Sequence, residues 1–142
     1  MSWLLDTNVV SELRKGTRCD PGVAAWIEGV DDEELFLSVL VIGELRRGIE
    51  LVRRKDAPAG EALDAWLRRT VEDHADRILA VDGAIAEQWG KLGSPSPIST
   101  IDGLLAATAL VHGLTLVTRN TKDIARTGVK FENPFSSRAR PR

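Results

Sequence analysis

Two carboxylates, Asp6 and Asp102, stand in apolar stretches of the sequence. Asp6 directly follows the apolar run Trp3–Leu5, which predicts a buried strand with Asp6 at its carboxyl end, where open parallel sheets bind ligands. Helical spacing places Asp102 beside the apolar side chains of its own predicted helix, where an isolated charge is costly unless it is paired. A cation shared with another carboxylate would explain these surroundings. Simpler roles stay open, because Asp6 could cap the next helix and Asp102 could favour the dipole of its own helix.

Glu44 and Asp123 repeat this pattern in a weaker form. The neighbours of Glu44 one helical turn earlier are apolar, and two nearby glycines leave room for something to approach the helix. The alternative for Glu44 is an ordinary ion pair with Arg47, worth about 0.3–0.5 kcal/mol. Asp123 follows the predicted strand Thr115–Thr118 and therefore lies at the same edge of the sheet. Asn120, three residues earlier, could face the same point or only cap a helical turn.

Carboxylates gathered at one edge of a sheet repel one another unless a cation neutralises them. Mg²⁺ prefers oxygen ligands, keeps several waters and commonly takes only one or two carboxylates directly. Such a site can lower the pKa of a bound water and shield a scissile phosphate from its own negative charge. The chain has two histidines, His74 and His112, and neither is near the four acids in sequence. The pattern therefore favours Mg²⁺ over a histidine-ligated zinc ion.

The elements that must position these acids alternate along the chain. Short apolar runs predict strands at Trp3–Leu5, Leu35–Ser38, Ile78–Ala80, Thr115–Thr118 and Val129–Phe131. Longer patterns predict helices at Asn8–Arg14, Pro21–Gly29, Val41–Arg54, Gly60–His74, Ala84–Leu92 and Ile101–His112. Strands separated by helices need crossover connections, so we expect an α/β fold whose parallel sheet is covered on both faces. We expect a helix–helix turn at Lys55–Gly60 and a rigid loop at Gly93–Pro97.

Length and composition fit one packed domain. The chain has 142 residues, of which 43% are hydrophobic and 28% charged, and this excludes intrinsic disorder for most of it. No apolar run approaches the roughly 20 residues of a membrane span, and no signal peptide is apparent, so we expect a cytoplasmic protein with no membrane association. A single cysteine excludes an intramolecular disulfide. We expect one domain over residues 1–135 and a disordered basic tail over 136–142.

The acids lie in four blocks whose order resembles PIN-domain proteins, in particular VapC-type toxins of bacterial toxin–antitoxin pairs. The blocks are Leu4–Leu13, Ser38–Arg46, Ile101–Ala109 and Leu116–Asp123. The resemblance implies a three-layer α/β/α sandwich around a mainly parallel sheet of about five strands. It also implies a Mg²⁺-dependent endoribonuclease, with Mn²⁺ able to substitute, that forms a homodimer and is inhibited by a cognate VapB-type antitoxin. Any contact with DNA would then be indirect, through the antitoxin.

The resemblance assigns roles to individual residues of this chain. Asp6 and Asp102 fall on the positions expected to touch metal, Glu44 on the second acid and Asp123 on the fourth. Some relatives carry an acid where this chain has Asn120, so Asp123 must supply the fourth carboxylate while Asn120 holds a water or phosphate.

Supporting roles fall to polar and basic residues near the acids. Asn8 and Thr118 are candidates for support of the metal ligands. The net charge of −2, from 19 basic and 21 acidic side chains, does not by itself indicate nucleic-acid binding. Arg46, Arg47 and Arg119 could nevertheless contact RNA phosphates, although a solvated helix face is the simpler interpretation of each arginine.

Two rival functions fit parts of the same pattern. A haloacid-dehalogenase-type phosphatase also has an aspartate after its first strand, but it needs a second acid where this chain has Asn8, which cannot transfer a proton. The stronger rival is a non-catalytic or weakly catalytic PIN subunit that binds a DNA-binding antitoxin as a transcriptional regulatory complex. The intact set of Asp6, Glu44 and Asp102 favours the nuclease.

Overall fold

A five-stranded parallel sheet forms the centre of the computed structural model, which describes residues 1–92 and 98–136. The strand order is β3-β2-β1-β4-β5, and every neighbouring pair is parallel. The strands are β1 (Trp3–Leu5), β2 (Leu35–Ser38), β3 (Ile78–Leu79), β4 (Thr115–Val117) and β5 (Phe131–Glu132). The predicted α/β class is confirmed.

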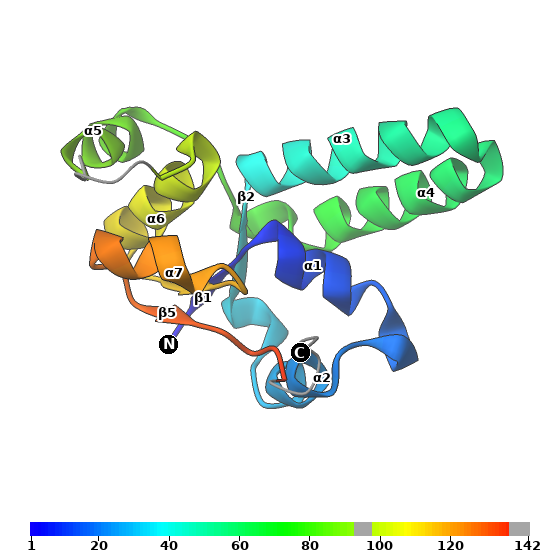
Figure 1. Cartoon of the computed structure of the whole chain (residues 1–142), viewed down its shortest axis with the longest axis horizontal. Coiled ribbons are helices and arrows are strands. Elements are labelled where there is room, and N and C mark those ends of the chain that lie inside the picture. The colour runs from blue at the N-terminus through cyan, green and yellow to red at the C-terminus, as the bar shows by residue number, and fades with distance from the viewer. Residues whose placement is uncertain (93–97, 137–142) are drawn as a thin grey trace.

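Helices cover both faces of this sheet, as Figure 1 shows. One side carries α1 (Thr7–Leu13), α2 (Pro21–Glu28), α3 (Val39–Lys55) and α4 (Ala57–Asp73). The other side carries α5 (Gly83–Lys91), α6 (Thr100–His112) and the short α7 (Thr121–Ile124). Single 3-10 turns lie at η1 (Gly16–Arg18), η2 (Asp32–Glu34), η3 (Ala75–Arg77) and η4 (Ala125–Thr127). None of the helices in residues 1–92 and 98–136 is both long and apolar enough to cross a membrane.

The middle strand β1 is where the direction of the chain across the sheet reverses. From β1 the chain adds β2 and β3 on one side, and it then returns to place β4 and β5 on the other. The β1–β4 pair is fixed by Leu4 opposite Leu116, and both side chains are fully buried. Where the connections that follow two neighbouring strands run in opposite directions, a crevice forms beyond the carboxyl ends of these strands. This crevice is the usual ligand site of such sheets. Asp6 and Thr118 directly follow these two strands.

Most of the predicted element boundaries differ from the observed ones by one to three residues, and two of these differences have a clear physical cause. The last strand begins at Phe131 rather than Val129, because the backbone N–H of Val129 donates to the Thr127 hydroxyl after a turn that ends at Gly128, φ +78°. The α3–α4 connection was expected to span Lys55–Gly60, but it consists of Asp56 alone. The Asp56 carboxylate accepts from the N–H of Ala59 at 3.1 Å and so caps α4.

The tight α3–α4 hairpin explains why Gly60 belongs to a helix rather than to a turn. A Cβ atom at Gly60 would lie 2.7 Å from the Cβ of Arg53, so only glycine allows the two helices to approach this closely. The expected loop at 93–97 and the tail beyond residue 136 lie outside the described residues.

Candidate active site

Asp6 is the buried centre of the site. Its side chain is 5% exposed and accepts three hydrogen bonds, from the backbone N–H of Thr7 at 2.7 Å, the Thr118 hydroxyl at 2.7 Å and the Asn8 amide at 3.4 Å. Asp6 therefore caps α1, which is the simpler of the two roles predicted for it, but the cap uses only one of its carboxylate oxygens. A carboxylate offers about four lone-pair positions, so one remains for a further ligand.

The loop after β4 connects Asp6 to Asp102. The Thr118 hydroxyl donates to Asp6 and accepts from the backbone N–H of Asn120 at 3.0 Å. The Asn120 amide donates to Asp102 Oδ2 at 2.8 Å, and the backbone N–H of Arg119 donates to the Asn8 side chain at 3.2 Å. Asn120 precedes α7 but makes no side-chain cap there, so its side chain serves Asp102 instead.

Asp102 lies in the first turn of α6, and its backbone N–H donates to the Ser99 hydroxyl that caps this helix. This position is favourable for the helix dipole, as the alternative interpretation proposed. The side chain nevertheless faces the loop after β4, since it accepts from Asn120. Both descriptions of Asp102 therefore hold together.

Glu44 reaches the site from the second turn of α3. Its Oε1 accepts from the Thr7 hydroxyl at 2.6 Å, which ties α3 to the residue next to Asp6. The alternative of an ion pair with Arg47 is not found among the described residues. Thr7 was missed in the sequence because its partner is 37 residues away, and no local spacing announces such a contact.

The electrostatics of the site show that its acids lie close enough to interact. Burial raises the pKa of Asp6 above its ordinary value, the hydrogen bonds from Thr118 and Thr7 lower it, and the charges of Asp102 and Glu44 raise it again. The net shift is upward. Ionised Asp6 is thus destabilised by its surroundings, and a bound cation would relieve this by neutralising charge.

The donor set suits a hard cation held by few protein ligands. Within residues 1–92 and 98–136, no three or more Asp, Glu, His or Cys side chains are grouped closely enough to hold a metal ion. The oxygen donors of Asp6 and Asp102 are of the kind that Mg²⁺ takes, since this ion binds through one or two carboxylates and keeps several waters. Asp6 and Asp102 are the two carboxylates linked through the Thr118–Asn120 loop.

Asp123 and Arg46 make their described contacts with other residues. Asp123 is on α7, and its carboxylate is 3.6 Å from the Arg126 guanidinium. Arg46 is bound to Asp64 of α4 at 2.6 Å and to Glu50 at 3.3 Å. The structure thus brings Asp6, Glu44 and Asp102 together without giving Asp123 a described contact to any of them.

Arg119 and Arg47 differ from Arg46 in their surroundings. Arg119 is exposed, and its guanidinium lies 4.7 Å from the ring centre of Phe135. Arg47 is exposed beside Glu44.

A family model for the PIN domain matches residues 3–130, and the chain belongs to the PIN domain family. The resemblance to VapC-type toxins is confirmed by proteins that are similar over most of its length. The VapC ribonuclease Y4jK of Sinorhizobium fredii is 33% identical over 93% of this chain and 96% of its own length. A structure of FitAB bound to an IR36 DNA fragment is 30% identical, with a TM-score of 0.83 over 93% of this chain and 94% of that chain. A toxin–antitoxin complex from Klebsiella pneumoniae is 26% identical, with a TM-score of 0.68 over 94% of this chain and 98% of that chain.

Proposed function

We propose that this chain is a Mg²⁺-dependent endoribonuclease and the toxin of a toxin–antitoxin pair. The observation that carries the proposal is the gathering of Asp6, Asp102 and Glu44 at the β1–β4 crevice, where Thr118 and Asn120 connect Asp6 to Asp102 and Thr7 connects Asp6 to Glu44. The similarity to a protein named as a VapC ribonuclease supports RNA as the substrate.

Asp6 and Asp102 would hold the cation, and Mn²⁺ could replace Mg²⁺. The bound cation would neutralise the carboxylates and stabilise the charge that grows on the phosphate during in-line displacement. Thr118 and the backbone of Thr7 would fix the Asp6 carboxylate and favour its ionised form, because they donate hydrogen bonds to it and so lower its pKa. Asn120 orients Asp102 through its amide.

Glu44 would orient the attacking water. Its carboxylate is fixed by the Thr7 hydroxyl yet is exposed to solvent, so it can accept a hydrogen bond from water at the site. Asp123 would act only through water, since its carboxylate is paired with Arg126 on α7. Arg47 and Arg119 would contact phosphates, whereas Arg46 is bound by Asp64.

We propose a VapB-type antitoxin as the inhibitor, a homodimer as the assembly, and contact with DNA only through the antitoxin. The similarity to a toxin–antitoxin complex and to a DNA-bound FitAB structure supports the antitoxin as a partner. A cytoplasmic location fits this function.

The test is cleavage of total cellular RNA by the antitoxin-free protein. We expect cutting with Mg²⁺, none with chelator, and none by Asp102→Asn, because the cation would lose one of its two direct carboxylates. Asp73→Asn, which changes an exposed acid at the end of α4, is the matched control and should cut normally. Cutting that survives both chelation and Asp102→Asn would refute the metal site. No cutting by folded wild-type protein would favour the regulatory-subunit alternative.

A further inference from the structure

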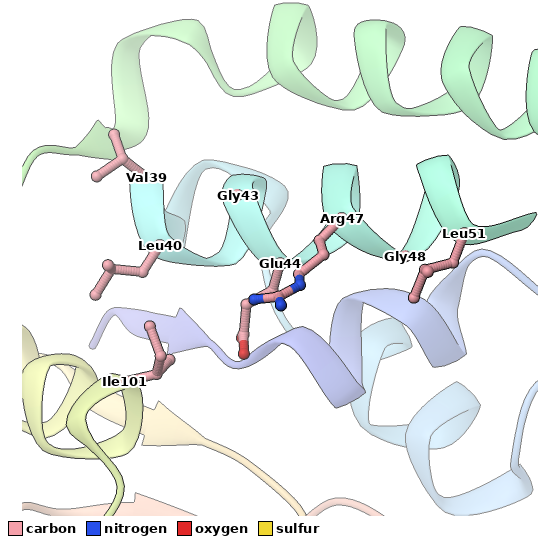
Figure 2. A pocket seen from close by; sticks show the side chains of 8 residues that line it. All are labelled: Val39, Leu40, Gly43, Glu44, Arg47, Gly48, Leu51 and Ile101. Atoms are coloured by element: carbon pink, nitrogen blue, oxygen red, sulfur yellow. The ribbon is translucent and has the colours of Figure 1, made fainter. Parts of the chain in front are cut away.

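A groove runs along α3 beside the acids. It is lined by one face of α3 from Val39 to Leu51 and by Ile101 of α6, and its volume is about 540 Å³. We call it the α3 groove. Figure 2 shows the side chains of Glu44 and Arg47 projecting from α3 to the same side, with Ile101 opposite. The groove is therefore continuous with the proposed active site, because Glu44 belongs to both and Ile101 immediately precedes Asp102.

The wall of the groove is aliphatic and open. Val39 is 41% exposed and Leu51 is 55% exposed, which makes them two of the most exposed large apolar side chains of the described residues. A Cβ atom at Gly43 or at Gly48 would meet nothing within 4 Å, so no other part of the described structure fills the space beside these glycines. An apolar surface of this kind is left available for a ligand.

The groove has one basic side chain, Arg47, and the packing of α4 explains why it is the available one. On the adjoining face of α3, Arg46 and Arg53 form ion pairs with Asp64, which binds Arg46 at 2.6 Å and Arg53 at 3.8 Å. Arg47 has no ion pair among the described residues and is exposed toward the groove. The α3 groove thus combines an aliphatic wall with an unneutralised cation.

We infer that the α3 groove binds the nucleotide next to the scissile phosphate of a single-stranded RNA. The base would lie against the aliphatic wall, and the Arg47 guanidinium would contact its phosphate or stack on the base. This inference rests on the proposed function, because it places the substrate relative to the same acids. Three features favour RNA as the occupant: Arg47 complements a phosphate, the groove continues into the acidic site, and its volume suits a ligand of nucleotide size.

The groove also predicts the kind of RNA that is cut. Its wall is aliphatic rather than aromatic, so it selects a base by fit and by contact with Arg47, not by aromatic stacking. A base reaches such a groove only when it is unstacked, and we therefore expect cleavage in single-stranded segments or loops. Changing the groove should alter which bases flank the cut.

The test fills the groove through its two glycines. Gly48→Leu and Gly43→Leu each place a side chain in the open space and should keep α3 folded, since leucine is a better helix former than glycine. Gly90→Leu on α5 is the matched control, because a Cβ atom there also meets nothing within 4 Å and the residue lies outside the groove. Arg47→Ala removes the cation without filling the space.

Binding is measured in the Asp102→Asn background with a labelled single-stranded oligoribonucleotide, and cut sites are mapped in the active protein. We expect the two groove variants and Arg47→Ala to weaken binding by about tenfold or more, with Gly90→Leu unchanged. We also expect the groove variants to shift the base preference at the cut.

Two outcomes would overturn the inference while leaving the nuclease intact. One is normal RNA binding and unchanged cut sites in both groove variants. The other is a fall in the molecular mass of the free protein in these variants alone, which would make the groove an interface between copies of this chain. Failure of wild-type protein to bind or cut RNA at all would instead refute the proposed function, and the inference with it.

Discussion

Replacing Thr118 with valine would measure how much the hydrogen bond from its hydroxyl stabilises the ionised form of Asp6. Thr118 is fully buried, and its hydroxyl donates to the Asp6 carboxylate at 2.7 Å. Valine has nearly the same shape, so Thr118→Val leaves no cavity; it removes this hydrogen bond and also the one that the Asn120 backbone N–H donates to the Thr118 hydroxyl, and only the first of the two involves the charge of Asp6. A hydrogen bond to a charged group contributes about 1.5–3 kcal/mol, and one between neutral groups about 0.5–1.5 kcal/mol. The loss of unfolding free energy should therefore depend on whether Asp6 is ionised.

The sign of the pH dependence follows from the raised pKa of Asp6. Because the folded chain holds this proton more tightly than the unfolded chain does, the protonated form favours folding at low pH, and this stability is lost as the pH rises through the folded pKa. Thr118→Val removes an interaction that lowers the pKa, so it moves the folded pKa further upward. We expect the variant to lose about 1.5–3 kcal/mol at neutral pH without metal, and less in acid.

The assay is denaturant unfolding with chelator present, comparing variant and wild type at each of several pH values. Thr108→Val is the matched control, because Thr108 is also fully buried but donates to the neutral carbonyl of Leu104 at 2.7 Å. Its loss should be about 0.5–1.5 kcal/mol and should not vary with pH. An equal loss for Thr118→Val at neutral and acid pH would refute the claim that its hydroxyl supports an ionised carboxylate.

Two further predictions concern the metal and the C-terminal segment. At neutral pH, Mg²⁺ should raise the midpoint of thermal unfolding of the wild-type protein and of the Asp123→Asn variant. It should not raise the midpoint of Asp102→Asn, and an undiminished shift in that variant would argue against Asp102 as a metal ligand. Gly22→Ala should cost about 1–3 kcal/mol of unfolding free energy in urea, because its Cβ would lie 2.4 Å from the Pro134 carbonyl oxygen, whereas Gly29→Ala, with 3.6 Å to its nearest atom, should cost less.

Much of the architecture is determined locally in this sequence. The residues before Asp6 and before Thr118 form β1 and β4. Each is a short apolar run bounded by polar residues, a pattern that is typical of a buried strand. Asp6 is the residue that leaves a central strand, so its place at the sheet edge follows from its sequence position once the strands are parallel. The helix ends follow from local signals too, such as Pro21 in a first turn and Gly113 in the left-handed conformation after α6.

Only the tertiary structure determines which contacts each of several similar side chains makes. Arg46 and Arg47 are adjacent in sequence, yet Arg46 is bound by Asp64 while Arg47 lines the α3 groove, because α4 covers only one face of α3. No period or motif within α3 distinguishes these two arginines.

The contacts that set the chemistry of the site are likewise long-range. Thr7 meets Glu44 across 37 residues, and Asn120 meets Asp102 across 18. The sequence by itself determined which acids stand at strand and helix ends, because capping and apolar periodicity act over a few residues. Which donor reaches which acid depends on how α3 and α6 pack against the sheet, and that packing is a property of the whole core.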